Sequence, residues 1–427
     1  MGKEKVGLVA LVLIVSSWAV SSASSSPSFG GDLSRGKASL TFGSASSSLV
    51  LNRVGSSVVL PLDGNVYPTG SYNTTIHIGQ PPKPYFLDPD TGSDLTWLQC
   101  DAPCVQCTRT PHPLYPPKGD LVNCNNPMCA SLHSGDYKCD RLERCEYKVQ
   151  YADGSSSRGV LVKDVVNFES YRGGFLRSHV TLGCGYDQPG PSNVDGVLGL
   201  GKGGSSIVSQ LSSQGLVANV LGHCLSTRGG GFLFFGDDLY DFPRITWRPL
   251  SYKSKHYSLV GTAELLFAGK PTGQKDLFLL FDSGSTYTYF SSEAYEALSS
   301  RVKEELRRKD FTKAVDDDTL PLCWKGWKSF KDIREVTKYF KPFALSFNSG
   351  GRTKTQFEVP PESYLIISDK GNVCMGVLNG TEIYPNANVI GDISMQDKMV
   401  IYDNANHFLG WASEDCSQLP KSRAFAA

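Results

Sequence analysis

The sequence predicts a mainly β fold made of two duplicated lobes, and three observations support this prediction. Short alternating runs of apolar and polar residues, separated by Gly, Pro, Asn and Asp, extend from about Val58 onward. Few segments have helical periodicity, and the clearest of them covers 292–309. Two short motifs also occur twice, in the same order and at the same separation. The 427 residues suffice for two lobes, each with its own core.

The repeated motifs are an Asp-[Ser/Thr]-Gly triplet and an apolar-apolar-Gly segment. The triplets begin at Asp90 and Asp282, each directly after an apolar run. Gly199 ends the first apolar segment 109 positions after Asp90, and Gly391 ends the second 109 positions after Asp282. Average composition predicts roughly 0.2 such triplets in a chain of this length. Two triplets with matching downstream motifs therefore indicate an internal duplication.

A duplication of this kind predicts a specific chemistry for the two aspartates. A two-fold axis between similar lobes brings equivalent positions together, so Asp90 and Asp282 would face each other. Two close carboxyl groups cannot both ionise easily, and they share one proton. The ionised member can activate a water while the neutral member protonates a carbonyl oxygen. This predicts peptide hydrolysis that needs no metal, no cofactor and no covalent intermediate.

The N-terminus predicts export. Lys3 and Lys5 precede a mostly apolar run, Val6–Val20, and small residues follow it, which is the layout of a cleaved signal peptide. An uncleaved N-terminal anchor is the alternative. We expect secretion to the extracellular or cell wall space, with the vacuole as the alternative destination. The predicted segments are a signal peptide (1–23), a propiece or linker (24–58), an N-terminal β lobe (59–245), a C-terminal β lobe (246–418) and a tail (419–427).

Composition excludes several kinds of partner. Lys plus Arg and Asp plus Glu both number 42, and this balance argues against binding to nucleic acid. No second long apolar run follows the N-terminal one, so we expect no stable membrane insertion after cleavage. We also expect the mature protein to be a monomer. Asn73 and Asn379 each begin an Asn-x-Thr triplet and are candidate glycosylation sites.

The twelve cysteines predict a disulfide framework, because their number is even and export leads to an oxidising compartment. Cys100, Cys104 and Cys107 have a spacing that resembles a zinc knuckle, but the compartment and the few nearby histidines favour disulfides. Connectivity does not follow from sequence alone, so the expected pairs are hypotheses: Cys323 with Cys374, Cys124 with Cys145, Cys129 with Cys139, and Cys184 with Cys416, which would link the lobes.

The two triplets and their surroundings resemble a known family. Asp90-Thr91-Gly92-Ser93 and Asp282-Ser283-Gly284-Ser285 are similar to the active-site turns of pepsin-type aspartic proteases. The resemblance extends from about Val58 to Cys416. The cysteine-rich insert that follows DLTWLQCDAPC (94–104) and the hairpin motif YADGSSS are similar to the nucellin-like plant branch. The resemblance implies a bilobal pepsin-like fold with the active-site cleft between the lobes, protein or peptide substrates, and inhibition by pepstatin-like compounds.

The resemblance also implies roles for single residues. Asp90 and Asp282 would be catalytic. Tyr151 would close over substrate as the flap tyrosine and Trp97 would steady it, although strand aromatics are common. The remaining supporting residues are Thr91 and Ser283, which would cross-link the two turns, Ser93 and Ser285, which would bond the outer carboxylate oxygens unless they are ordinary turn serines, and Gly92 and Gly284.

Pro89 departs from the family pattern, which more often has a small aliphatic residue before the first Asp. Proline lacks an N–H and fixes φ, so it is unfavourable within a central strand. We expect the strand to end one residue early or to have an unpaired position there.

Two other functions fit parts of this pattern. A binding or inhibitor protein with the same fold but without catalysis is the first, although both triplets and Tyr151 are intact. A glycosidase also uses paired carboxylates, but nothing requires these to lie in duplicated triplets. The sequence therefore favours an aspartic endopeptidase with an acidic pH optimum.

Overall fold

The computed structural model describes residues 57–117, 120–133, 143–170, 174–189, 193–347, 355–385 and 387–419. The predicted signal peptide, nearly all of the predicted propiece, residues 420–427 of the predicted tail, and Cys139 lie outside these ranges. In the part of the chain that is described, no helix has the length and apolar character needed to cross a membrane.

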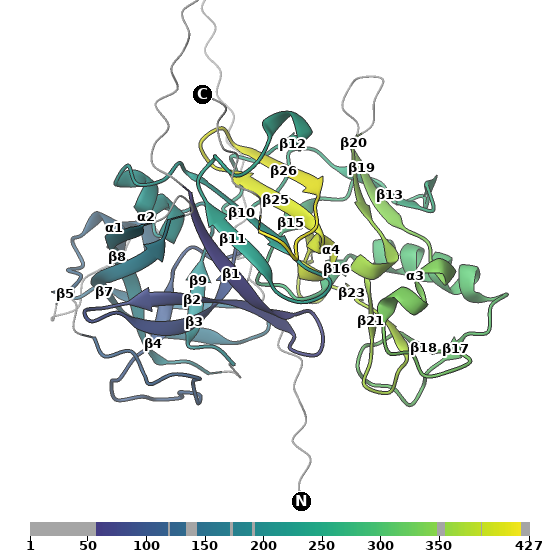
Figure 1. Cartoon of the computed structure of the whole chain (residues 1–427), viewed down its shortest axis with the longest axis horizontal. Helices are drawn as coiled ribbons and strands as arrows, with labels where there is room; N and C mark the ends of the chain where they lie inside the picture. The colour runs from purple at the N-terminus through teal and green to yellow at the C-terminus, as the bar shows by residue number, and fades with distance from the viewer. Residues whose placement is uncertain are drawn as a thin grey trace, which may run out of the picture. The chain divides into compact units, whose positions relative to one another are not determined.

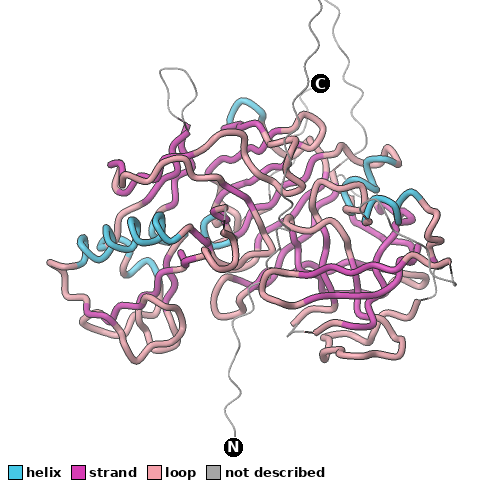
Figure 2. The backbone as a smooth tube through the Cα atoms, turned by 180° about the vertical axis from the view of Figure 1, so that it is seen from behind, coloured by secondary structure: helices cyan, strands magenta, loops and turns pink. Residues whose placement is uncertain are grey.

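The fold is mainly β, as the sequence predicts (Figure 2). Fourteen of the described strands form one sheet. Its order is β12 (Thr246–Pro249), β26 (Phe408–Ser413), β25 (Lys398–Asp403), β10 (Val220–Leu225), β11 (Gly231–Phe235), β1 (Val58–Asn65), β2 (Ser71–Ile78), β3 (Lys83–Asp90), β9 (Gly196–Gly199), β4 (Trp97–Gln99), β8 (Phe175–Asp187), β7 (Ser156–Glu169) and β5 (Asp120–Leu121), with β6 (Glu146–Gln150) paired to β7.

The other described strands form three small sheets of the second half. They are β14 (Lys270–Pro271), β13 (Ala263–Phe267), β19 (Phe343–Phe347) and β20 (Thr355–Val359); β15 (Leu279–Phe281), β24 (Asn388–Ile390), β16 (Thr288–Phe290) and β23 (Val377–Asn379); and β17 (Thr312–Lys313), β18 (Cys323–Lys325), β22 (Val373–Met375) and β21 (Leu365–Ile367). The α-helices are α1 (Pro127–Leu132), α2 (Ile207–Ser213), α3 (Ser292–Leu306) and α4 (Asp392–Met395), and 3₁₀ turns cover 242–244, 333–335, 337–339 and 361–363.

The strands around the two Asp triplets have the same topology. In the first half β3 is parallel to β9, β9 is antiparallel to β4, and β4 is parallel to β8. In the second half β15, β24, β16 and β23 repeat this pattern. Leu87 pairs with Gly196 and Leu279 with Asn388, so the partners lie 109 positions apart in both halves. The predicted duplication is therefore present in both strand order and register.

The two halves share one run of strands in the large sheet. Figure 1 shows the purple strand β1 and the yellow strands β25 and β26 on either side of β10 and β11. The pairing of β10 with β25, in which His223 lies opposite Val400, joins the halves by backbone hydrogen bonds. Strands far apart in sequence thus fix the position of the lobes.

Local sequence explains the elements nearest the proposed site. Tyr72, Thr74, Ile76 and Ile78 of β2 are buried, which gives the two-residue period expected for a strand with one face in the core. The hairpin predicted around YADGSSS is formed by β6 and β7, where Gln150 pairs with Ser156.

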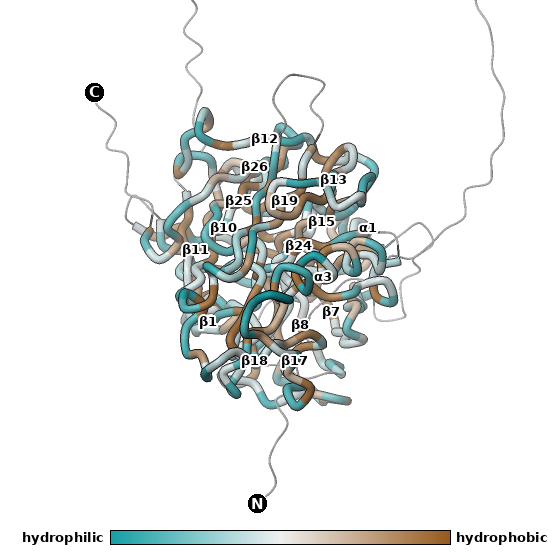
Figure 3. The backbone as a smooth tube through the Cα atoms, turned by 90° about the vertical axis from the view of Figure 1, so that its right-hand side faces the viewer, coloured by the Kyte–Doolittle hydropathy of each residue, from teal (hydrophilic) through white to brown (hydrophobic). Residues whose placement is uncertain are grey.

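The predicted helix over 292–309 is confirmed as α3, which ends at Leu306 rather than at Lys309. The Ser291 hydroxyl caps it by accepting a hydrogen bond from the Ala294 N–H at 3.4 Å. Leu298, Val302 and Leu306 are buried. Figure 3 shows α3 mainly in the hydrophilic colour, because its other faces are charged or polar.

The structure confirms one of the expected disulfides and contradicts the other three. Cys323 pairs with Cys374 as expected, since β18 and β22 place the two residues opposite each other. Cys129 pairs with Cys145, so the expected pairs Cys124–Cys145 and Cys129–Cys139 are wrong. Cys184 bonds Cys100 rather than Cys416, because the pairing of β4 with β8 brings the first two together.

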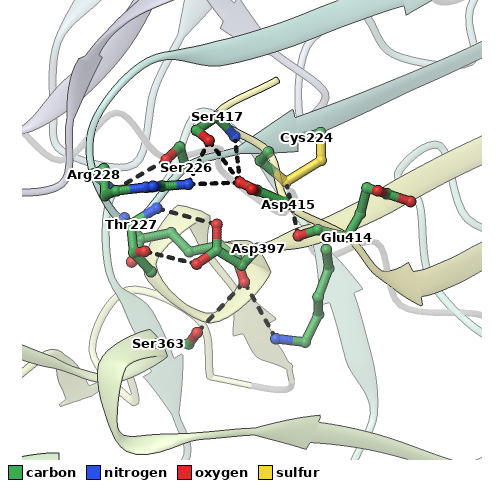
Figure 4. The surroundings of a disulfide bond; sticks show 12 residues. Cys224, Ser226, Thr227, Arg228, Ser363, Asp397, Glu414, Asp415 and Ser417 are labelled. Atoms are coloured by element: carbon green, nitrogen blue, oxygen red, sulfur yellow. Dashed lines mark hydrogen bonds and ion pairs between the residues drawn. A yellow bond between two sulfur atoms is a disulfide. The ribbon is translucent and has the colours of Figure 1, made fainter. Parts of the chain in front are cut away.

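The lobe-linking disulfide is formed by Cys224 and Cys416 (Figure 4). Cys224 lies in β10 within the shared run of strands, and Cys416 follows β26. Arg228 and Asp415 form an ion pair of 2.7 Å beside this disulfide. The expected link between lobes therefore exists, with a different N-lobe cysteine. Cys104 and Cys107 form a short-range disulfide, and Cys124 is also disulfide-bonded.

Removal of the Cys224–Cys416 disulfide should destabilise the protein strongly, because the bond closes a loop with a sequence separation of 192. We expect Cys224→Ala/Cys416→Ala to lower the free energy of unfolding by about 2–5 kcal/mol. The matched control is Cys104→Ala/Cys107→Ala, which opens a separation of only 3 residues. Thermal unfolding of both double variants checks this, and equal losses of Tm would contradict the loop argument.

Candidate active site

The first Asp triplet lies where β3 leaves the centre of the large sheet. Asp90 is 2% exposed, and its carboxylate accepts hydrogen bonds from its own turn. The Gly92 N–H donates to Asp90 Oδ1 at 2.8 Å, and the Ser93 hydroxyl donates to Asp90 Oδ2. The Leu200 N–H bonds the Asp90 carbonyl at 2.8 Å, which ties the turn to the segment after β9.

The second triplet repeats this geometry after β15. The Gly284 N–H donates to Asp282 Oδ1 at 3.0 Å, and the Ser285 hydroxyl donates to Asp282 Oδ2 at 2.8 Å. Asp282 is 6% exposed. The bonds predicted for the two serines are therefore present at both carboxylates.

Reciprocal hydrogen bonds join the two turns. The Thr91 N–H donates to the Ser283 hydroxyl at 3.1 Å, and the Ser283 N–H donates to the Thr91 hydroxyl at 2.9 Å. Each hydroxyl then donates onward to a carbonyl of the opposite half: Ser283 to Pro89 at 2.7 Å, and Thr91 to Phe281 at 3.4 Å. The cross-links implied by the resemblance thus fix one turn against the other.

The two carboxyl groups influence each other's protonation. Burial, which disfavours the charged form, is the largest influence and raises the pKa of both groups. The charge of Asp90 raises the pKa of Asp282 further, while the interaction with Asp282 lowers that of Asp90. Such a pair holds one proton between its members over a wide range of pH.

Glycines allow the close approach of the backbones here. A Cβ at Gly284 would lie 2.4 Å from Asp90 Oδ1. Behind the turns, a Cβ at Gly199 would lie 2.4 Å from the Asp94 backbone, and one at Gly391 would lie 2.1 Å from the Tyr287 carbonyl oxygen. Any side chain at these positions would push the turns or their supporting strands apart.

Tyr151 lies at the tip of the β6–β7 hairpin, where its N–H bonds the Ser155 carbonyl at 2.9 Å. The Trp97 indole N–H donates to the Tyr151 hydroxyl at 2.7 Å, as the resemblance implies. Tyr151 is 2% exposed. Burial raises the pKa of its hydroxyl well above the usual range, and the charge of Asp90 raises it further. The hairpin tip is therefore on the side of Asp90.

Pro89 does not end the strand, so the first of the two expectations is wrong, but it is unpaired on the side of β2. β3 includes both Pro89 and Asp90, and Pro89 pairs with Leu198 of the parallel strand β9. The pairing of β3 with β2 ends earlier, at Leu87 and Thr74. The missing N–H of proline therefore removes no bond from that ladder, and the Pro89 carbonyl is used by Ser283.

Two buried acids beside the pair were missed by the sequence reasoning. Asp88 and Asp392 are 6% and 3% exposed. Asp392 Oδ1 has no hydrogen-bond partner among the described residues. Burial raises the pKa of both carboxyls well above the usual range; the charges of Asp90 and Asp282 raise that of Asp88 further, and the charge of Asp88 raises that of Asp392. For Asp88 the sequence did contain a signal, because LDPD places an acid within an apolar strand run.

The remaining predicted positions do not meet at this site. Asn73 lies in β2 and is half-buried, whereas Asn379 is exposed at the end of β23, where its amide donates to the Ser292 hydroxyl at 3.0 Å. Two groups in the described ranges have metal-like spacing, and each contains a disulfide, Cys129–Cys145 or Cys323–Cys374. These sulfurs are not available as thiolates.

Comparisons with known proteins agree with this geometry. Residues 72–237 match a family model described as "Xylanase inhibitor N-terminal", and residues 263–413 match "Xylanase inhibitor C-terminal". The chain is 44% identical to a protein of Oryza sativa subsp. indica that is named as an aspartic proteinase, over 86% of this chain and 93% of the relative. It is 30% identical to "Aspartic proteinase 39" of Arabidopsis thaliana, over 86% of this chain and 79% of the relative.

The chain belongs to the plant pepsin-type aspartic protease family. Among solved structures, Basic 7S globulin from soybean has a TM-score of 0.67 with 16% identity, over 86% of this chain and 99% of that one. The structure titled "Crystal structure of edgp" has a TM-score of 0.66 with 19% identity, over 86% and 97% of the two chains. At this identity the likeness concerns the bilobal pepsin-like fold.

The hydrogen bonds between Thr91 and Ser283 should contribute to the free energy of unfolding. Thr91→Val keeps the shape of the side chain but leaves the buried Ser283 N–H without an acceptor, so we expect a loss of about 1–3 kcal/mol in the free energy of unfolding. Thr312→Val, at an exposed strand position, is the control and should have little effect. Denaturant unfolding of both variants measures the difference. Equal stability of the two would show that the cross-link contributes nothing.

The buried acids should make stability depend on pH. Their pKa values are raised in the folded state. Below the ordinary pKa of an aspartate these groups are therefore protonated in both the folded and the unfolded chain, and they do not reduce folding stability. As pH rises above that value the unfolded chain ionises, and folding stability falls until the folded pKa is reached, by about 1.4 kcal/mol per pH unit for each group. Asp392→Asn should therefore reduce the loss of Tm between pH 4 and pH 7. Asp310→Asn, an exposed acid, should retain the wild-type slope.

Proposed function

We propose that this chain is an aspartic endopeptidase of the secretory pathway, which hydrolyses peptide bonds with a water activated between Asp90 and Asp282. The observation that carries the proposal is the matched environment of the two carboxyls. Each accepts one backbone N–H and one serine hydroxyl, and reciprocal hydrogen bonds between Thr91 and Ser283 fix the two turns against each other. A buried, rigid pair of this kind can exist with one proton and one negative charge.

The reaction follows from that charge state. The ionised carboxylate takes a proton from water as the water oxygen attacks the peptide carbonyl carbon. The neutral carboxyl gives its proton to the carbonyl oxygen, which yields a neutral tetrahedral diol. The carboxyl that is now protonated then gives its proton to the amide nitrogen while the other carboxylate takes a proton from one diol hydroxyl. The C–N bond breaks, a carboxylic acid and an amine are released, and the pair again holds one proton. Tyr151, over the pair, would exclude bulk water once substrate is bound.

The supporting bonds keep this geometry without restricting the proton. Thr91 and Ser283 fix the turns through backbone groups, so both carboxyls remain free to exchange the proton. Ser93 and Ser285 donate to the outer oxygens, which directs the inner oxygens toward each other and toward the water. These roles imply protein or peptide substrates and inhibition by pepstatin-like compounds.

We also propose how the protein is exported and matured. The signal peptide (1–23) would direct export, to the extracellular space or the vacuole, and the propiece (24–58) would be removed from a monomeric zymogen. Asn73 and Asn379 would be glycosylated during export; the exposure of Asn379 supports the second site. No metal or other cofactor has a role in this reaction scheme.

The matching family models are described by the words "Xylanase inhibitor", so a catalytically silent inhibitor is the second candidate function. The two functions predict different results for one assay. A protease should cleave a fluorogenic peptide library at acidic pH and be blocked by pepstatin. An inhibitor should cleave no peptide and should instead reduce the activity of a glycoside hydrolase. The intact hydrogen-bond set at both carboxyls favours the protease.

Replacement of either aspartate should abolish turnover without unfolding the protein. We expect Asp90→Asn and Asp282→Asn each to lose at least about 10³-fold in kcat, or roughly 4 kcal/mol of barrier, because the amide cannot take a proton from water. Tyr151→Phe should lose far less, since the ring remains. For the wild type, kcat should peak in mildly acidic solution and fall on both sides, as the pair gains a second proton or loses its only one. A folded Asp282→Asn variant with near-normal turnover would overturn the two-carboxylate mechanism.

A further inference from the structure

A histidine of the second half reaches the first catalytic turn. His256 lies in the segment between β12 and β13, and its Nδ1 is 3.2 Å from the carbonyl oxygen of Gly92. Gly92 is the residue whose N–H holds Asp90 Oδ1. The ring therefore contacts the peptide that positions a proposed catalytic carboxylate, from the opposite half of the molecule.

The chemistry of this contact defines the tautomer. A carbonyl oxygen only accepts hydrogen bonds, so Nδ1 must hold a proton in both charge states of the ring. A second proton can bind only at Nε2. His256 can therefore change its charge without breaking its bond to Gly92, which makes it both a support and a titrating group.

The neighbouring residues hold the ring in place. Tyr257 is fully buried, and its hydroxyl donates to the Leu200 carbonyl at 3.1 Å. Lys202 Nζ donates to the Ser251 carbonyl at 2.9 Å. Both bonds connect the segment that includes His256 to the residues directly after β9, which is the strand behind the first turn. The segment is thus anchored on both sides of His256.

The charges around His256 are mixed. Asp90 and Asp94 lie near it as anions, and Lys202 lies near it as a cation. Lys255, its neighbour in the chain, acts on Asp94 with it. Burial lowers the pKa of His256 below its usual value, while the bond to Gly92 and the two aspartates raise it. In return, the charge of His256 lowers the pKa of Asp90. The ring therefore takes up its second proton at a lower pH than a free imidazole does.

We propose that His256 is a positioning residue of the active site, which holds the Gly92 peptide at every pH and, as a cation in acid, keeps Asp90 able to ionise. This inference rests on the proposed function and concerns how that function extends to low pH. Without the cation, Asp90 would be protonated at a higher pH, and the pair would lose its single negative charge earlier as the solution becomes more acidic.

Two substitutions separate the support from the charge. His256→Asn places an amide N–H near the position of Nδ1, so it can keep the bond to Gly92, but it cannot become a cation. His256→Phe keeps a ring but removes both the bond and the charge. His407→Asn is the matched control: it makes the same change at an exposed histidine, whose ring contacts that of Tyr252 at a tilt.

The primary readout is the pH profile of kcat for a fluorogenic peptide. For His256→Asn we expect the acid limb to move upward by about 0.5 pH unit with the alkaline limb unchanged. His256→Phe should show the same shift together with a roughly tenfold lower kcat, because the Gly92 peptide has lost its support. His407→Asn should match the wild type. Unchanged acid limbs in both His256 variants, or a lower kcat without a shift, would overturn the proposal.

A second readout does not depend on activity. NMR titration of the His256 ring in the full-length protein should show a lower pKa in Asp90→Asn than in the wild type, because a nearby anion has been removed, and the coupling is reciprocal. The same pKa in both proteins would refute the coupling even if the wild type cleaves peptides. Conversely, a shifted ring pKa in a protein without peptidase activity would contradict the proposed function and leave the His256–Asp90 coupling established.

Discussion

The reciprocal hydrogen bonds between Thr91 and Ser283 are the constraint on which the rest of this structure depends. They join two turns from different halves, and each hydroxyl satisfies a buried backbone N–H that would otherwise be unpaired. Because the carboxylates of Asp90 and Asp282 are held by the same turns, these bonds also set the distance between them. The spacing of the two carboxyls and the contact between the two turns thus depend on one set of hydrogen bonds.

Concentrating acids at this position has an energetic cost that the surroundings offset. Two carboxylates accept four hydrogen bonds from their own turns, while Asp88 and Asp392 remain buried beside them with raised pKa values. Such a cluster is tolerated when most of its members are neutral. The same physical condition favours folding and the shared proton, and both are met in acidic solution.

The two halves are held together by more than the turns. The pairing of β10 with β25 makes one continuous sheet from strands of both halves, and Cys224–Cys416 closes it covalently. The proposed site therefore has two sets of supports. One is the shared run of strands, and the other is the pair of contacts that His256 makes with the first turn and Tyr257 makes with the segment after β9. Each half is thereby positioned by residues of the other.

The sequence by itself determined the duplication, the Asp pair and the supporting hydroxyls, because these depend on local motifs and on a repeat that can be counted along the chain. The Cys323–Cys374 pair, which the sequence offered only as a hypothesis, is also present. Only the tertiary structure decided the other disulfides, the continuation of β3 through Pro89, and the places of Asp88, Asp392 and His256. Those features depend on which strands pair across the two halves, and strand pairing between distant segments leaves no periodic signal in the sequence.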